Sequence, residues 1–154
     1  MEKLDEIDLK ILRILQQDAK KTTKEVAEML NLTISPVYER IKRLEKGGYI
    51  RKYVALLDKK LVNIPITAIC MVSLRYHHEG FIDKFEKQIK ALKEVQECYH
   101  MAGKVDFFLK INLSSLDEYH ELVRLKLSKI ENIGVLESYF VLKEITSSTE
   151  YVIW

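Results

Sequence analysis

The stretch LNLTISPVYERIKRLEKGGYI, residues 30–50, combines the start and stop signals of a helix with a run of basic side chains. Asn31 is the non-glycine residue best suited to the left-handed conformation that ends a preceding helix. Thr33 can cap a new helix, and Pro36 fits the first turn, where a missing amide donor costs nothing. The glycine pair 47–48 is a typical helix end. The stretch therefore predicts a helix from about residue 34 to residue 46.

This predicted helix has two different faces. Val37, Ile41 and Leu44 follow the spacing i, i+4, i+7, so they share one face and are expected to be buried. The opposite face is polar and mostly cationic; it carries Ser35, Glu39, Lys42, Arg43 and Lys46, flanked by Tyr38 and Arg40. Such a face is either an ordinary solvated surface or a surface that reads DNA.

The preceding residues favour the second interpretation. Asp5 is a predicted helix cap, with Asp8 three residues on, and an apolar stripe with helical spacing predicts a helix that ends near Gln17. Thr22 and Glu25 form the sequence pattern of a capping box and predict a short helix over residues 23–30. Two helices separated by a three-residue turn are the outline of a helix-turn-helix.

The charge distribution points to an anionic partner. The formal net charge of the 154-residue chain is only +2, but residues 1–60 hold 14 basic and 10 acidic residues, and residues 61–154 hold 11 and 13. The excess is sharpest between Lys20 and Lys60, where 11 basic residues oppose 5 acidic ones. Together with the helix-turn-helix pattern, this predicts double-stranded DNA as the partner.

The remainder of the chain alternates strand and helix patterns. Residues 49–57 are predicted to form a strand, with Arg51 and Lys52 at its start within reach of a phosphate backbone, and residues 58–65 a linker. Further strands are predicted at 66–76, 95–102, 107–113 and 135–142, the last of them after Gly134. Helices are predicted at 80–92 and from the Ser115/Glu118 capping pattern onward, with Leu116 among the inward residues of the second helix. The order βαββαβ indicates a ferredoxin-like domain with both helices on one face of an antiparallel sheet.

The predicted fold class is therefore α+β. A helix-turn-helix (winged-helix-like) domain over residues 1–60 would be joined by a strand to a ferredoxin-like domain over residues 61–154. Apolar residues are plentiful for the two faces of a four-stranded sheet: Tyr99, Met101, Phe108, Tyr139 and Phe140. A small domain seldom leaves so many apolar side chains in water, so we expect a homodimer that joins sheet faces. Two recognition helices could then enter major grooves about 34 Å apart.

The segments LDEIDLKILRILQQDAK (4–20), LTISPVYERIKRLEKGGYIRKY (32–53) and AGKVDFFLKI (102–111) resemble the Lrp/AsnC, or feast/famine, transcription regulators. The resemblance covers nearly the whole chain. It implies a DNA-binding domain joined to an effector-binding and oligomerisation domain, with dimers that often assemble into tetramers or octamers. It also implies small-molecule effectors, commonly amino acids, that bind between dimers near the turn after the second strand of that domain.

Two sets of candidate site residues follow. For DNA contacts the candidates are Ser35, Pro36, Tyr38, Glu39, Arg40, Lys42, Arg43, Lys46, Arg51 and Lys52. Among them, Glu39 can accept a hydrogen bond from cytosine, and Arg40 or Arg43 can donate hydrogen bonds to guanine. The resemblance implies an effector site at Met101, Ala102, Gly103, Lys104, Val105 and Asp106.

The effector turn has an equally simple structural interpretation. Gly103 would supply a positive φ in a hairpin, and Asp106 would bond the backbone. The family often has a hydroxyl residue before this glycine and an aromatic residue before the aspartate. Ala102 and Val105 stand there, which points to an atypical effector or to none.

Other chemistry has no positive support in the sequence. Cys70 and Cys98 are expected to be free, buried thiols, and the four histidines lack the spacing of a metal site. No cofactor is expected, and neither a signal peptide nor a membrane span is apparent, which favours a cytoplasmic protein. Two alternatives stay open: an enzyme resembling the sirohaem decarboxylases, which share this architecture, and an architectural protein that wraps DNA with little sequence preference.

Overall fold

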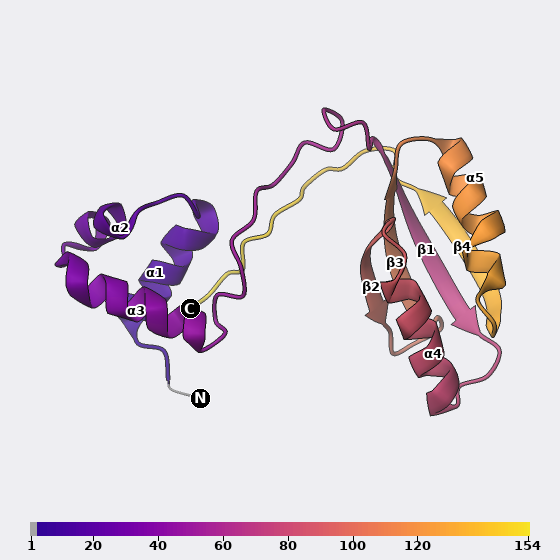
Figure 1. The fold of residues 1–154 in the computed structure, drawn as a ribbon, viewed down its shortest axis with the longest axis horizontal. Helices are drawn as coiled ribbons and strands as arrows, with labels where there is room; N and C mark the ends of the chain where they lie inside the picture. The colour runs from indigo at the N-terminus through magenta and orange to yellow at the C-terminus, as the bar shows by residue number, and fades with distance from the viewer. Residues whose placement is uncertain (1–2) are drawn as a thin grey trace. The chain divides into compact units, whose positions relative to one another are not determined.

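The computed structural model describes residues 3–154, which form two compact units (Figure 1). The first unit contains the chain up to Leu56 together with Thr146–Trp154, and the second contains Leu57–Ile145. The division thus falls at Leu56 instead of residue 60. The last nine residues, which the sequence analysis assigns to the second domain, belong to the first unit.

Three helices build the first unit: α1 (Glu6–Gln17), α2 (Thr23–Leu30) and α3 (Ile34–Lys46). Each turns one apolar stripe inward, and the buried core consists of Ile11, Leu15, Val26, Ala27, Val37, Ile41 and Leu44. The predicted inward face of α3 is therefore confirmed. Reciprocal capping boxes begin α1 and α2, formed by Asp5 with Asp8 and by Thr22 with Glu25.

The turn between α2 and α3 has the geometry that its sequence predicts. Asn31 adopts the left-handed conformation (φ 54°, ψ 42°), and the amide of Leu32 donates to the carbonyl of Ala27 over 2.9 Å. Thr33 occupies the cap position of α3 in an extended conformation, but its side chain makes no capping bond. Gly48, at φ +76°, turns the chain away after α3.

The predicted strand over residues 49–57 is wrong. Residues 51–58 have no regular secondary structure, and Val54, Leu56 and Leu57 are exposed. Only the first two residues of the stretch pack on the core of the first unit, through Tyr49 and Ile50. Apolar, β-branched content favours a strand only where a neighbouring strand can bond the backbone, and residues 51–57 have none within the described chain.

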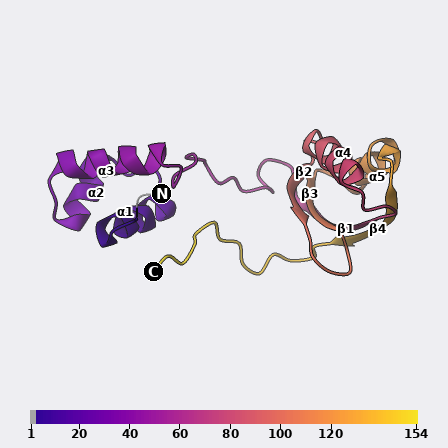
Figure 2. The ribbon, with the colours of Figure 1, turned by 90° about the horizontal axis from the view of Figure 1, so that it is seen from below.

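The second unit is a four-stranded antiparallel sheet of β1 (Ile66–Leu74), β2 (Val95–His100), β3 (Phe107–Leu113) and β4 (Ile133–Phe140), in the order β2-β3-β1-β4. Two helices, α4 (Glu79–Lys90) and α5 (Leu116–Leu125), cover the same face of this sheet (Figures 1 and 2). A short 3-10 helix, Leu127–Lys129, follows α5. The predicted ferredoxin-like arrangement is confirmed.

Aromatic packing dominates the core beneath the helices. Phe85 of α4 and Phe107 of β3 are fully buried, with ring centroids 4.4 Å apart, and the His100 ring stacks with Phe107 at 4.6 Å. Alternate residues of β1 and β3 complete this layer, since side chains of a strand point to opposite faces in turn.

Some local details of this unit differ from the sequence prediction. Leu116, expected to point inward, is 54% exposed because it is the first residue of α5. Glu118 bonds the amide and hydroxyl of Ser114 instead of completing a reciprocal box with Ser115. Cys70 and Cys98 are both free, as predicted, but Cys98 is exposed because β2 is an edge strand. Gly134 lies inside β4 instead of before it.

The face of the sheet opposite the helices is only partly polar. Tyr99 and Phe108 pair across β2 and β3 with ring centroids 5.9 Å apart, and Met71 and Tyr139 lie on the same face by register. An ion pair between Lys110 and Glu97 (2.9 Å) crosses this face. Phe140, in contrast, lies on the helix side, where its ring meets Tyr119 edge-on at 5.0 Å.

The end of the chain packs on α1 within the first unit. Arg13 donates from Nη2 to the carbonyl of Ile153 over 2.8 Å, and the side chain of Gln16 exchanges two hydrogen bonds with the backbone of Tyr151. These bonds explain why Thr146–Trp154 clusters with the three helices. No helix among residues 3–154 is long and apolar enough to cross a membrane.

Candidate nucleic-acid interface

The outward face of α3 presents polar side chains to solvent. Ser35, Tyr38, Glu39, Lys42 and Lys46 are all exposed, and they lie opposite the stripe that packs on α1 and α2. Pro36 is also exposed, in the first turn of the helix. This is the arrangement that a helix needs if one side is to pack and the other is to enter a DNA groove.

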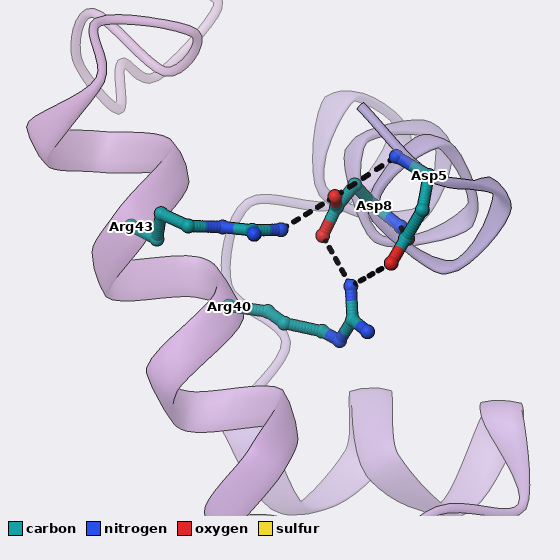
Figure 3. Close-up of polar contacts among 4 residues, drawn as sticks. All are labelled: Asp5, Asp8, Arg40 and Arg43. Atoms are coloured by element: carbon teal, nitrogen blue, oxygen red, sulfur yellow. Dashed lines mark hydrogen bonds and ion pairs between the residues drawn. The ribbon is translucent and has the colours of Figure 1, made fainter. Parts of the chain in front are cut away.

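Two of the predicted DNA contacts lie elsewhere on the helix and are bound to carboxylates of α1 (Figure 3). Arg40 Nη1 donates to Asp8 Oδ1 over 2.8 Å and to Asp5 Oδ2 over 2.5 Å. Arg43 Nη2 donates to Asp8 Oδ2 over 2.5 Å. Asp8 is fully buried, whereas the two arginine side chains are 26% and 40% exposed.

The same carboxylates cap α1. Asp8 Oδ2 accepts from the amide of Asp5, and Asp5 Oδ1 accepts from the amide of Asp8. The backbone amide of Asp8 and the guanidinium of Arg40 hold the pKa of the Asp5 carboxyl below its usual value. Hydrogen bonds to the two acids raise the pKa of Arg40 in return. The sequence shows Asp5 and Asp8 as a cap but gives no sign of their arginine partners.

Lys42 lies in a second, more exposed cluster. Its ammonium group contacts Glu45 Oε2 at 3.0 Å and lies 5.8 Å from the centroid of the Tyr38 ring. Glu45 also accepts a 3.0 Å hydrogen bond from the hydroxyl of Tyr53. Partial burial, and then the bond to Glu45, raise the pKa of Tyr53 to about 12. Glu45 and Tyr53 were absent from the predicted site; only the i, i+3 spacing of Lys42 and Glu45 could have suggested the pair.

The remaining basic candidates are open to solvent. Lys46, Arg51 and Lys52 are exposed and make no ion pair within residues 3–154. Lys46 is on the last turn of α3, and the other two follow the glycine pair that ends it. Such side chains can neutralise phosphates without first giving up a protein partner.

The helix that supports α3 depends on its own cap, and this gives a testable pH effect. Glu25 accepts hydrogen bonds from the amide and the hydroxyl of Thr22, each over 2.7 Å, and these bonds hold the pKa of Glu25 below its usual value. A depressed folded-state pKa contributes stability above the unfolded pKa and loses it as the pH falls through the folded pKa. Glu25→Gln should therefore reduce the acid destabilisation of α2 below about pH 4.5.

Thermal unfolding at pH 6 and pH 3.5, followed through amide resonances of α2, measures this effect. Glu28→Gln removes a carboxylate from the same helix without touching the cap and is the matched control. An equal loss of stability on acidification in Glu25→Gln and in the wild type would contradict the prediction.

The predicted effector turn connects β2 to β3. Met101, Ala102, Gly103 and Lys104 are exposed, and Val105 is half-buried. Gly103 has a positive φ of 157°, as the hairpin interpretation expects.

Asp106 already has protein partners. Its Oδ2 accepts from the amide of Leu74 over 2.6 Å, and its Oδ1 lies 3.0 Å from Nε2 of His77. The backbone of Asp106 also bonds Val72 and Met101. These bonds hold the turn against the end of β1. An effector that used this carboxylate would have to share it with, or displace, the imidazole of His77.

The structure offers no cluster for metal chemistry among residues 3–154: no three His, Cys, Asp or Glu side chains lie close enough together to hold an ion. His77 contacts Asp106, His78 precedes α4, and His100 stacks on Phe107.

Comparison with known proteins places both units in one family. Residues 4–51 match the model of a winged helix-turn-helix DNA-binding domain, and residues 67–151 match the model of the Lrp/AsnC ligand-binding domain. The chain is 33% identical to the leucine-responsive regulatory protein of Haemophilus influenzae, over 97% of this chain and 90% of that protein. It is also 33% identical to a glutamate uptake regulatory protein of Zymomonas mobilis, over 96% and 89% of the two chains.

Solved structures agree over almost the full length. A transcriptional regulator of Neisseria meningitidis, solved as a complex with L-methionine, superimposes with a TM-score of 0.92 at 31% identity, covering 97% of each chain. An AsnC-family regulator of Agrobacterium tumefaciens gives the same TM-score at 32% identity, also over 97% of each chain. With its helix-turn-helix DNA-binding domain and its ligand-binding domain, the chain belongs to the Lrp/AsnC family of transcriptional regulators.

Proposed function

We propose that this regulator reads a palindromic operator as a dimer, with the exposed face of α3 in the major groove of each half-site. The observation that carries the proposal is the two-sided α3: Val37, Ile41 and Leu44 are buried, while Ser35, Glu39, Lys42 and Lys46 are exposed on the opposite face. Glu39 can accept from cytosine N4, and the lysines supply charge toward guanine or phosphate.

The dimer is proposed to form through the open face of the sheet. Tyr99, Phe108, Met71 and Tyr139 place apolar surface there, on the side that α4 and α5 leave uncovered. A second copy would bury this surface and bring two recognition helices onto one DNA duplex, in the cytoplasm. Tetramers or octamers of such dimers remain compatible with this arrangement.

Selection from a random-sequence DNA pool tests the DNA-binding proposal. The expected product is a palindrome with half-sites one helical turn, or a multiple of it, apart. If about six phosphates are neutralised, log K should fall with log salt with a slope near −5. Fluorescence anisotropy on the selected site from 50 to 200 mM salt measures the slope.

Two results would contradict the proposal. A flat preference across the pool would favour an architectural, DNA-wrapping protein. Absence of DNA binding at low salt would favour the sirohaem-decarboxylase-like enzyme, which a visible absorption spectrum with added sirohaem would identify.

We further propose that an amino acid binds at Met101–Asp106 and shifts DNA occupancy. Support comes from the exposed turn and from the relatives, which are named for leucine and glutamate or were solved with L-methionine. Because Asp106 is engaged with Leu74 and His77, the exposed residues Met101–Lys104 would make most of the contacts, together with a neighbouring subunit. Such an effector acts through its differential affinity for two assemblies.

Isothermal titration with L-leucine, L-methionine and L-glutamate tests this site. At least one of them should bind the wild type, and Ala102→Trp should abolish binding, because an exposed alanine at the turn can be enlarged without touching the core. Leu116→Trp, at another exposed site at the start of α5, is the control. If Ala102→Trp binds the amino acid as well as the wild type does, the effector site lies elsewhere than in this turn.

A further inference from the structure

We infer that Asp8 is a positioning residue for DNA recognition: its buried carboxylate holds Arg40 and Arg43 against α1, so that both arginines orient the recognition helix instead of contacting DNA. The inference rests on the proposed role of α3 and narrows it. It also reassigns the two residues that the sequence analysis places among the guanine contacts.

The first support is the way the carboxylate is used. Asp8 is fully buried, and each of its oxygens accepts from a different arginine, at 2.8 Å from Arg40 and 2.5 Å from Arg43. Removing one cationic partner of a buried carboxylate is strongly destabilising, because it leaves a buried charge that is not fully compensated. If an arginine left Asp8 to contact DNA, the new contact would therefore have to offset the lost stabilisation of the buried carboxylate.

The second support is charge balance. Asp5 and Asp8 supply two negative charges, and Arg40 and Arg43 supply two positive ones, within one hydrogen-bonded cluster (Figure 3). The formal charges of these four side chains cancel. These four side chains therefore add little to the positive potential that α3 presents. Lys46 makes no ion pair within residues 3–154, and Lys42 adds its charge once it exchanges Glu45 for DNA.

The third support is helix geometry. Arg40 and Arg43 are three residues apart, so both side chains leave α3 on the same side, one turn apart. Two anchors on one side fix the rotation of α3 about its own axis. Base reading depends on that rotation, because Ser35, Glu39 and Lys42 must meet base edges at hydrogen-bond distance. The buried Asp8 thereby sets which residues face the groove.

The test compares Asp8→Asn with the wild type on the selected operator and on a scrambled duplex. Asparagine keeps the size of the side chain but removes the charge, which weakens its bonds to Arg40 and Arg43 and makes it easier for both arginines to turn toward phosphates. We expect the ratio of specific to non-specific affinity to fall about 10-fold, the equivalent of one lost base contact. We also expect the salt slope on scrambled DNA to steepen by up to about one for each arginine released.

Glu6→Gln is the matched control, because it removes one negative charge from the exposed surface of the same helix. The inference is overturned if folded Asp8→Asn keeps the specificity ratio and the salt slope of Glu6→Gln. The wild type separates this inference from the proposed function. If the wild type prefers no operator, both the proposed function and this inference fail. If the wild type is operator-specific and Asp8→Asn is equally specific, only this inference is overturned.

A second pair of variants covers the case in which Asp8→Asn does not fold. Arg43→Met leaves Asp8 bound to Arg40, and Lys42→Met removes the neighbouring lysine. We expect Lys42→Met to reduce the salt slope by about one in each protomer and Arg43→Met to leave it unchanged while lowering specificity. If Arg43→Met reduces the slope as much as Lys42→Met, Arg43 contacts phosphate and the inference is wrong.

Discussion

Replacement of Lys42 and Lys46 by alanine should weaken operator binding about 100- to 1000-fold at 0.1 M salt, while the protein stays folded. Both side chains are exposed, so their removal disturbs neither the core of α3 nor the cluster around Asp8. Each phosphate that a protein neutralises contributes about 0.9 to the salt slope. The loss of two such contacts in each protomer of a dimer should therefore lower both the affinity and the slope strongly. Anisotropy titrations at several salt concentrations measure both the affinity and the slope.

The loss should be nearly independent of DNA sequence if the lysines contact phosphates, and sequence-dependent if either reads a base. Lys42 must first exchange Glu45 for the DNA, because the two side chains contact each other at 3.0 Å in the free protein. Lys10→Ala/Lys87→Ala removes two exposed lysines that lie outside α3 and serves as the control. If the operator affinity changes by less than about threefold relative to this control, α3 is not part of the DNA interface.

Phe107→Ala should lower the free energy of unfolding of the second unit by about 3–5 kcal/mol, the usual cost of truncating a buried phenylalanine. The Phe107 ring is fully buried and contacts both Phe85 and His100, with centroids 4.4 and 4.6 Å away, so its removal leaves a cavity that neighbours on two elements cannot easily fill. Urea unfolding followed through amide resonances of β1 and β3 measures the stability of the second unit separately from that of the helices in the first unit.

Leu116→Ala provides the comparison, because it also truncates an apolar side chain but at an exposed position of α5. Its cost should stay within about 0.5 kcal/mol, as for most surface substitutions. Equal losses in the two variants would mean that the ring of Phe107 is not the centre of this core. The DNA-binding unit should keep its stability in both variants, because Phe107 and Leu116 belong to the other unit.

Local sequence signals were sufficient for most of the first unit. The caps at Asp5 and Thr22, the left-handed Asn31 and the glycine pair after α3 all act within a few residues of one another, so their patterns can be recognised without a tertiary structure. The same holds for the alternation of β1 and β3 and the helical spacing of α4. These periodicities, added to the family resemblance, predicted the βαββαβ order that the sheet adopts.

Errors arose where the outcome depends on a distant partner. Residues 49–57 have the composition of a strand, but no neighbouring strand is present to bond them. Leu116 fits a helical stripe, but as the first residue of α5 it lies outside the packed region. Residues 146–154 carry no pattern that predicts their contact with Arg13 and Gln16 on α1, more than 130 positions away.

By itself, the sequence determined the helix-turn-helix, the ferredoxin-like domain and the basic character of α3, because each depends on contacts between near neighbours along the chain. Only the tertiary structure decided which cations of α3 remain available. Arg40 and Arg43 look like Lys42 and Lys46 in the sequence, yet the packing of α3 on α1 brings the first pair to a buried aspartate 32 and 35 residues away. That choice rests on the cost of burying an unpaired charge, which a linear pattern does not contain.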